Sequence, residues 1–288
     1  MTAIVTRSFV WSWDGCPLSV GVDEQGDGPP ILCLPAPSSI STRGELHALI
    51  GELAGAGAGR LVVPDWPGFG DEPRPAIRWS PAALSAFLSD FADRELRSLH
   101  ATIAAGHAAT YALDLTVRQP GRLGRLVLLA PTWRGPLPTA FGGDRPLLRR
   151  LQRAIEAPVV GPLLYRLNVN PLMARMMVAG HVYSRTRPLT GGQRAVMRAP
   201  GARFASGAFV TGGLDLLGSR DAFLDLARRA RVPILVAYGR DTPPKSRAEM
   251  EALASLPEVS SVVLPHGKLG IHEEFAAALA PSLLRFLA

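Results

Sequence analysis

The chain has 288 residues, of which 47% are hydrophobic and 19% are charged; this balance is typical of a folded globular protein and excludes a disordered one. The formal net charge of +7 comes almost entirely from arginine, but basic and aromatic residues are not interleaved and no nucleic-acid-binding module is recognisable. We therefore expect no nucleic-acid partner.

The N-terminus, the most apolar region and the cysteines bear on the cellular compartment in which we expect the protein. The N-terminus has no charged segment followed by an apolar run, so we expect no signal peptide, and prolines and arginines interrupt the most apolar region, 157–183. Cys16 and Cys33 lie in predicted strands without metal-ligand spacing and are interpreted as small buried hydrophobic residues. We expect a soluble, cytoplasmic protein with no metal ion and no cofactor.

The first part of the chain reads as short strands around a Pro/Ser-rich loop. Asp14-Gly15 is a hairpin signal between two β-type runs, and Thr42 with Glu45 predicts a capping box that begins a helix running toward Leu53. Continuous apolar runs indicate strands buried on both faces of a parallel sheet. The strands predicted here are residues 9–13, 18–22, 31–34 and 60–63.

The next segment alternates helix and strand. Ser80 and Pro81 predict the start of a helix, because serine caps a helix and proline suits its first turn. The apolar face of that helix comprises Leu84, Phe87, Leu88 and Phe91. A strand over 102–105, a helix ending near Gln119 and a strand over 126–129 follow.

The alternation stops between Trp133 and Ser219, where segments of helical pattern are punctuated by proline and glycine. One amphipathic helix sets arginines against apolar residues, and its basic face indicates a solvated surface, a membrane-surface contact or a partner contact. A second segment, 171–178, is rich in methionine, which fits either core packing or the roof of an apolar pocket. The residues concerned are Arg145, Arg149 and Arg153 opposite Leu147, Leu148, Leu151 and Ile155, and then Leu172, Met173, Met176 and Met177.

After this region the alternation resumes with a strand over 232–238, a helix over 247–256, a strand over 259–264 and a last helix. The apolar face of the last helix comprises Phe275, Leu279, Leu283 and Phe286. Buried strands separated by helices predict an α/β fold with a mostly parallel sheet and helices on both sides.

Three segments then resemble the α/β-hydrolase superfamily: the turn Asp65-Trp-Pro-Gly-Phe-Gly70, the segment Ala105-Gly-His-Ala-Ala109, and Leu126-Val-Leu-Leu-Ala-Pro131 ahead of the helical region. The resemblance implies an eight-stranded sheet with helices on both faces. It also implies an α/β-hydrolase core at residues 1–132 and 220–288, a helical cap inserted at 133–219, and a pocket between cap and core.

The chemistry of that superfamily needs a nucleophile, an acid and a histidine base in that chain order. The resemblance places Ala108 at the nucleophile elbow, where it has no attacking group. It places Asp241 near the acid, and Leu269 or, with a shift, Lys268 where the histidine belongs. His272 is nearby, but we expect it to open the last helix. Because two of the three positions are replaced, one engineered substitution does not explain the pattern.

Other residues near the elbow are also candidates. The resemblance implies that the backbone N–H groups of Ala36 and Ala109 serve as oxyanion-hole donors, although Pro35-Ala36 replaces the family's usual His-Gly. His107 is expected to pack under the turn, and Trp133, after the carboxyl end of a strand, is expected to line the pocket. The predicted pocket residues are Pro35, His107, Trp133, Met173, Met176, Met177 and Leu269.

Three hypotheses follow. The first is a protein that binds or converts an apolar or aromatic small molecule without ordinary ester hydrolysis. The second is a lyase, isomerase or cofactor-free oxygenase in which Asp241 and His272 act as acid and base. The third is a regulatory or scaffold protein that acts through the basic helix of the cap. Activity, ligand and oligomeric state stay open at this level.

Overall fold

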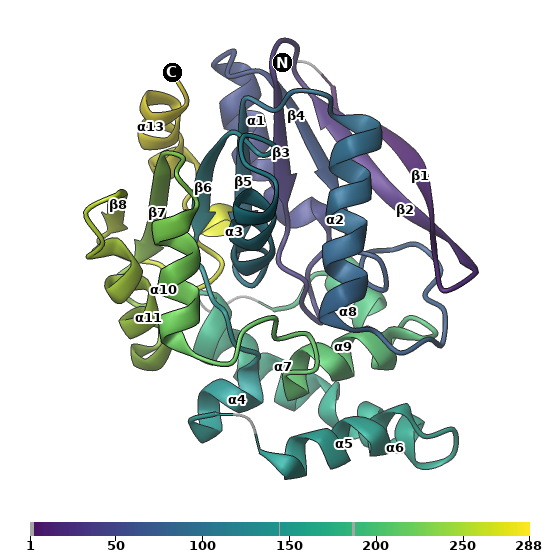
Figure 1. Cartoon of the computed structure of the whole chain (residues 1–288). Helices are drawn as coiled ribbons and strands as arrows, with labels where there is room; N and C mark the ends of the chain where they lie inside the picture. The colour runs from purple at the N-terminus through teal and green to yellow at the C-terminus, as the bar shows by residue number, and fades with distance from the viewer. Residues whose placement is uncertain (1–2, 144, 186–187) are drawn as a thin grey trace.

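A single eight-stranded sheet organises the molecule, as Figure 1 shows. The computed structural model describes residues 3–143, 145–185 and 188–288. The strand order is β1-β2-β4-β3-β5-β6-β7-β8; β2 is antiparallel to both of its neighbours, and the pairings from β4 to β8 are parallel. The strands are β1 (Val5–Trp13), β2 (Cys16–Gln25), β3 (Pro30–Leu34), β4 (Arg60–Pro64), β5 (Ala101–Ala105), β6 (Arg125–Leu129), β7 (Ile234–Gly239) and β8 (Val259–Leu264).

The hairpin between β1 and β2 is confirmed. Asp14 and Gly15 both have positive φ, at 50° and 73°, which is the geometry that a two-residue turn between antiparallel strands needs. Both strands are longer than predicted, because the ladder continues from Trp13↔Cys16 to Val5↔Glu24. The polar residues of this outer part do not show the apolar pattern by which a buried strand is recognised.

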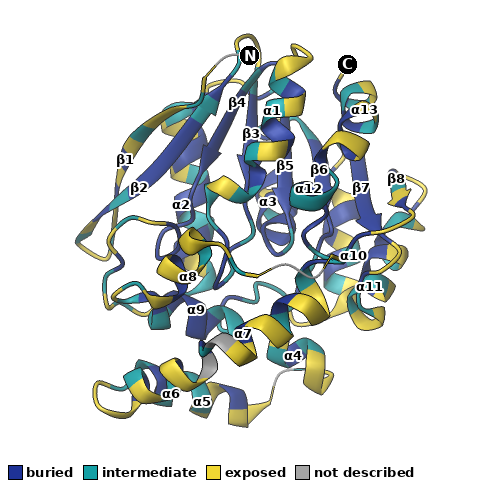
Figure 2. Ribbon diagram, turned by 180° about the vertical axis from the view of Figure 1, so that it is seen from behind, coloured by how far each residue is buried: buried dark blue, intermediate teal, exposed yellow. Residues whose placement is uncertain are grey.

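Helices cover both faces of the sheet (Figures 1 and 2). On one face, α3 contacts both α2 and α10, while on the other face α1 contacts α13. The helices of these layers are α1 (His47–Gly55), preceded by the short 3-10 helix η1 (Arg43–Leu46), α2 (Pro81–Glu95), α3 (Ala108–Arg118), α10 (Arg220–Arg229), α11 (Pro244–Ala254), α12 (Ile271–Glu274) and α13 (Ala276–Leu287).

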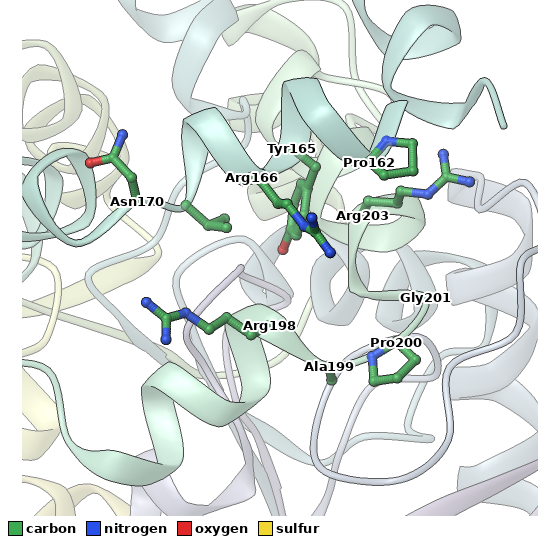
Figure 3. Close-up of a pocket in the computed structure, with 10 residues that line it drawn as sticks. Pro162, Tyr165, Arg166, Asn170, Arg198, Ala199, Pro200, Gly201 and Arg203 are labelled. Atoms are coloured by element: carbon green, nitrogen blue, oxygen red, sulfur yellow. The ribbon is translucent and has the colours of Figure 1, made fainter. Parts of the chain in front are cut away.

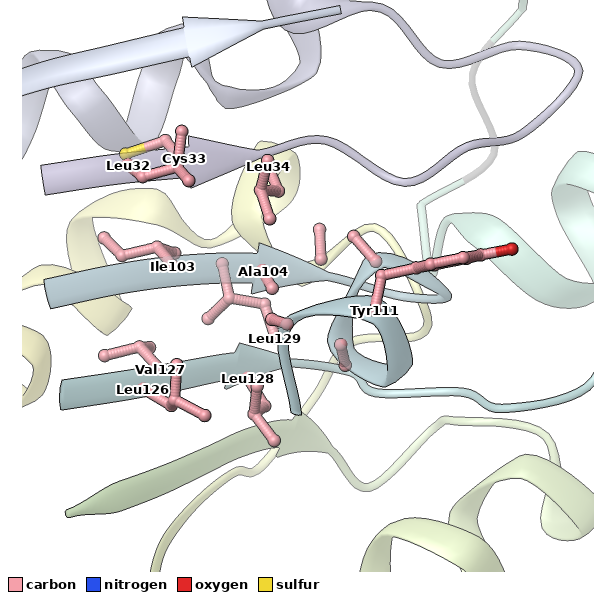
Figure 4. Close-up of a cluster of buried hydrophobic side chains, with 14 of the residues drawn as sticks. Leu32, Cys33, Leu34, Ile103, Ala104, Tyr111, Leu126, Val127, Leu128 and Leu129 are labelled. Atoms are coloured by element: carbon pink, nitrogen blue, oxygen red, sulfur yellow. The ribbon is translucent and has the colours of Figure 1, made fainter. Parts of the chain in front are cut away.

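The main core lies on the central strands, which Figure 4 shows with the start of α3. Leu32, Ile103 and Val127, on β3, β5 and β6, have no exposed surface, and Cys33 is equally buried as a free thiol. These are the continuous apolar runs that predicted strands covered on both faces, and the prediction is confirmed.

The helix α2 also follows its sequence signals. The Ser80 side chain accepts a hydrogen bond from Ala83 N, and a proline occupies the first turn. All four predicted apolar-face residues are buried, namely Leu84, Phe87, Leu88 and Phe91. Capping and burial therefore act on the same stretch of chain, which is why its boundaries were predictable.

Between β6 and α10 the structure is helical, as predicted. No helix of the described residues is long and apolar enough to cross a membrane.

The predicted amphipathic helix is α5, but Leu147 is 65% exposed while Leu148 and Ile155 are buried, because α5 lies against α9 and α6 along one narrow stripe. The elements are α4 (Pro136–Phe141), α5 (Pro146–Glu156), α6 (Val160–Asn168), α7 (Pro171–Met177), the π-helical turn η2 (Val178–Val182), α8 (Gly191–Arg198) and α9 (Ala202–Thr211).

Two local predictions are correct only in part. The helix expected over 247–256 is α11, which begins earlier because Pro244 fits its first turn. The capping box of Thr42 is half correct: its side chain accepts from Gly44 N at 3.2 Å, but the carboxylate of Glu45 binds Ala36 N instead of closing the box. This second difference places the Glu45 carboxylate beside the loop that follows β3.

Candidate functional site

The sharp turn between β5 and α3 is centred on Gly106. Its φ is +52°, its N–H donates to Leu129 O at 2.8 Å, and its carbonyl accepts from Thr132 N at 3.0 Å. Ala108, which the sequence places at the nucleophile elbow, is the first residue of α3 and lies two residues after this corner. A Cβ atom on Gly106 would lie 3.1 Å from the Ala36 Cβ, so the corner faces the loop after β3.

His107 packs beneath this turn, as expected. It is 1% exposed, its Nε2 lies 3.1 Å from Leu214 O, and its ring meets Tyr111 and Phe209 edge-on. Burial lowers the pKa of His107 to about 4, and the hydrogen bond to the Leu214 carbonyl offsets this only in part. The neutral ring at neutral pH thus fixes the turn and supplies no charge to the site.

The predicted oxyanion-hole donors are already engaged. Ala36 N donates to Glu45 Oε1 at 2.7 Å, and Ala109 N donates to Gly106 O at 3.3 Å. In this structure both predicted donors thus have an acceptor within the chain. A carboxylate of the chain itself binds the Ala36 donor.

The same carboxylate meets His272. The His272 Nε2 lies 3.3 Å from Glu45 Oε1, and the two side chains are 4% and 7% exposed. Burial acts to lower the pKa of His272, but the nearby carboxylate of Glu45 outweighs it, so the pKa is raised above its ordinary value. His272 belongs to α12, which contacts η1, the helix that carries Glu45.

A second carboxylate completes this cluster. Ligand atoms of Glu45, His272 and Glu273 lie within 4.8 Å of one another, a spacing that could hold a cation. Glu273 accepts a hydrogen bond of 2.6 Å from the Tyr183 hydroxyl, which in turn accepts one of 2.7 Å from Gln193 Nε2. The sequence does not single out Glu45 or Glu273 for this cluster, because Glu45 is far from both other residues in the chain and has the pattern of a helix cap.

Asp241 lies elsewhere, so the predicted pairing of Asp241 with His272 is wrong. Its Oδ2 accepts from Gly267 N at 3.0 Å and from the Ser184 hydroxyl at 3.1 Å, and it is 3.5 Å from His266 Nδ1. The hydrogen bond from Gly267 is the main reason why the pKa of Asp241 is lowered. The His266 side chain is 71% exposed, so this pair lies at the surface.

The predicted histidine position is filled by residues that hold the loop to η2. The Lys268 ammonium donates to Ala179 O at 2.5 Å, and Leu269 N donates to His181 O at 3.2 Å. Leu269 is half-buried against the main core. Neither side chain can accept a proton from a nucleophile in the way that an imidazole does.

The remaining predicted pocket residues differ in exposure. Trp133 is 3% exposed and donates from Nε1 to Glu249 Oε2 at 3.0 Å, so it packs between strand and helix. Pro35 is buried as well. Met173 and Met176 on α7 are 48% and 62% exposed. Met177 is half-buried against the smaller core cluster.

A buried ion network positions η1. Arg43 Nε lies 3.0 Å from Asp23 Oδ1, its Nη1 contacts Asp65 and Asp71, and its backbone N–H donates to Asp65 Oδ1 at 2.6 Å. The guanidinium packs over Gly21, where a side chain would collide with it. Burial raises the pKa of Asp65 to about 6 even though Arg43 opposes the shift. Because this network holds Arg43, it also holds the short helix that carries Glu45.

The chain is similar in fold to solved structures of low sequence identity. A probable hydrolytic enzyme from Pseudomonas aeruginosa PAO1 has 18% identity and a TM-score of 0.73, with 100% of this chain and 96% of that chain covered. A loop variant of a haloalkane dehalogenase from Bradyrhizobium elkanii has 17% identity and a TM-score of 0.70, with 99% and 96% covered. The epoxide hydrolase CorEH has 15% identity and a TM-score of 0.71, with 98% of each chain covered.

The sequence itself decides the family. No curated protein sequence gives a significant match. The model of the alpha/beta hydrolase family matches residues 31–281, which include every strand from β4 to β8 and nearly all of β3. The sheet order and the helices on both faces agree with that match. This chain therefore belongs to the alpha/beta hydrolase family.

Proposed function

We propose that this protein binds an apolar or aromatic small molecule between a helical cap, residues 133–219, and the carboxyl ends of the strands, and that it forms no acyl-enzyme. The observation that carries the proposal is the corner between β5 and α3. The residue with positive φ is Gly106, and the first helical residue is Ala108. Neither has a side-chain oxygen or sulfur that could attack a carbonyl.

The other two catalytic positions support the same reading. Asp241 binds Gly267 and Ser184 rather than an imidazole in the interior, and Lys268 and Leu269 stand where the family's histidine is expected. Loss of such residues lowers hydrolase rates by many powers of ten. A chain that lacks the nucleophile and the histidine at their usual positions keeps the architecture for binding but has no route through a covalent serine intermediate.

Exposed apolar residues of α7 and the names of two similar folds support an apolar ligand. Leu172, Met173 and Met176 on α7 are exposed, and unbranched thioethers adapt to irregular apolar surfaces. Two of the similar folds are named for haloalkanes and epoxides, which are small molecules of low polarity. Ligands of open α/β sheets bind at the carboxyl ends of the strands, where Gly106 lies.

A ligand screen tests the proposal. We expect at least one apolar or aromatic compound to raise the melting temperature of the purified protein, because a ligand that binds the folded state stabilises it by mass action. Ala36→Leu should abolish the shift by adding bulk next to Gly106, whereas Ala82→Leu, on an exposed position of α2, should leave it intact. A broad screen without a shift, or a shift that Ala36→Leu leaves unchanged, contradicts the proposal.

A second candidate function is acid–base catalysis by Glu45 and His272. The specific observation is that a buried imidazole lies 3.3 Å from a carboxylate that is itself fixed by Ala36 N, next to the corner. A carboxylate that orients an imidazole and stabilises its protonated form is suited to proton abstraction in a lyase or isomerase reaction. This pair replaces the Asp241–His272 pair that the sequence suggested.

A further inference from the structure

A second concave site lies within the helical region after β6. It has a volume of about 560 Å³, within the range of small-molecule pockets. As Figure 3 shows, α6 forms one side, and the end of α8 with the start of α9 forms the other. The described lining residues are Pro162, Tyr165, Arg166, Val169, Asn170, Arg198, Ala199, Pro200, Gly201 and Arg203.

The charges at this pocket have one sign. Arg166, Arg198 and Arg203 line it, and the described lining residues include no aspartate or glutamate. Among the described residues, Arg166 and Arg198 have no recorded hydrogen bond or ion pair. Arg203 instead donates from Nη1 to the carbonyls of Ile155 and Ala157 and stacks 4.1 Å from the Phe204 ring centre. Two cations at the pocket thus lack a partner within the described chain.

A fourth arginine, Arg74, lies behind the pocket lining at Gly201. Arg74 is 6% exposed, and its Nε and Nη1 have no hydrogen-bond partner among the described residues, while Nη2 donates to Gly70 O. Its backbone lies against Gly201, whose φ of +78° and close approach leave no room for a side chain. Its positive charge also acts on the phenol of Tyr165, a lining residue. The buried Arg74 guanidinium therefore adds positive potential on the side of the pocket that Tyr165 and Gly201 form.

The other lining residues are apolar or have their polar group in a hydrogen bond within the chain. Pro162, Val169, Ala199 and Pro200 offer carbon surface, and the Tyr165 hydroxyl donates to Met197 O at 3.0 Å. Arg166 and Arg198 line the pocket from different helices, as Figure 3 shows. A planar guanidinium binds carboxylate, sulfonate or phosphate oxygens with paired hydrogen bonds, and proline and valine surfaces fit a hydrocarbon or ring.

We propose that this pocket binds a small organic anion whose acidic group pairs with Arg166 and Arg198 and whose apolar body lies against Pro162, Val169 and Pro200. The site is separate from the corner at Gly106, since no residue of that corner lines it. It therefore adds a second ligand position in the helical region after β6, independent of what binds above the sheet.

Two fluorescent probes that differ in charge test this proposal. Anilinonaphthalene sulfonate carries an aromatic body with an anionic group, and N-phenylnaphthylamine carries the same kind of body without it. The double variant Arg166→Gln/Arg198→Gln should bind the sulfonate about tenfold more weakly than the wild type, because charge-assisted hydrogen bonds are lost. Its affinity for the neutral probe should not change.

The control is Arg175→Gln, an exposed arginine of α7 that does not line the pocket. It should leave both affinities at the wild-type value, and added salt should weaken sulfonate binding to the wild type more than to the double variant. A sulfonate affinity that falls equally in Arg175→Gln and the double variant, or does not fall in the double variant, overturns the proposal. Circular dichroism verifies that each variant is folded.

Discussion

Replacing Arg43 with alanine is expected to lower the free energy of unfolding by about 3–5 kcal/mol. Arg43 contacts Asp23, Asp65 and Asp71, and the side chains of Asp23 and Asp65 are 3% and 2% exposed. Removal of the guanidinium leaves the buried Asp65 without its cation and leaves Asp23 with only Thr6 and His47 as partners, and burial of an unpaired charge is expensive. Urea denaturation at neutral pH measures the loss.

The pH dependence of this loss is informative. Because burial raises the pKa of Asp65 to about 6, the folded protein holds this proton more tightly than the unfolded chain, whose aspartates have the ordinary value of 3.8. Protonated Asp65 needs no cation, so the loss caused by Arg43→Ala should be smaller at pH 5 than at pH 8. Arg7→Ala is the matched control: Arg7 pairs with Glu24 and Glu95 but is 35% exposed, and its loss should stay below about 1 kcal/mol. Equal losses for the two variants would contradict this account of the network.

Replacing Glu45 with alanine is expected to cost a similar amount, about 3–5 kcal/mol. The change removes the partner of His272 and leaves the Ala36 N–H without its acceptor. Glu45→Gln separates these effects, since the amide oxygen can still accept from Ala36 N while the negative charge is lost. We expect Glu45→Gln to destabilise less than Glu45→Ala.

The sign of the pH effect follows from His272. Its pKa is raised in the folded protein, so the pair contributes its full stability below the ordinary histidine value of 6.5 and loses it as the pH rises through the raised value. The difference between wild type and Glu45→Gln should thus be larger at pH 6 than at pH 9. Imidazole NMR should show His272 titrating at lower pH in Glu45→Gln. An unchanged His272 titration in that variant would rule out the charge pairing and remove the basis for acid–base catalysis here.

The fold could be predicted wherever burial and local signals agree. Apolar runs such as 126–129, the cap at Ser80 and the turn at Asp14-Gly15 each combine a pattern with a local cause, and all three are found in the structure. The face of α5 was less predictable. Leu147 fits the helical period but is exposed, because the width of a contact depends on the neighbouring helices and not on the period.

The types of residue at the candidate site could be predicted from the sequence, but their positions in space could not. The lack of a serine, cysteine or aspartate at residues 105–109 can be seen in the sequence, but several alignments of Ala105-Gly-His-Ala-Ala109 with the turn are possible, and only the backbone places the corner at Gly106. Glu45 has two plausible partners in sequence terms, and the tertiary fold selects Ala36 N and His272 over the helix cap. Contacts between η1 and α12 join residues from opposite ends of the chain, which no local pattern encodes.

The proposal that this protein forms no acyl-enzyme is tested most directly by treating the protein with an alkyl fluorophosphonate and measuring its intact mass. The reagent labels activated serines, and a known serine hydrolase treated in parallel should be labelled completely. We expect this chain to keep its unmodified mass, because neither Gly106 at the corner nor Ala108 at the start of α3 has a nucleophilic side chain. A stoichiometric adduct, for example on Ser38 or Ser41 of the loop beside Ala36, would contradict it.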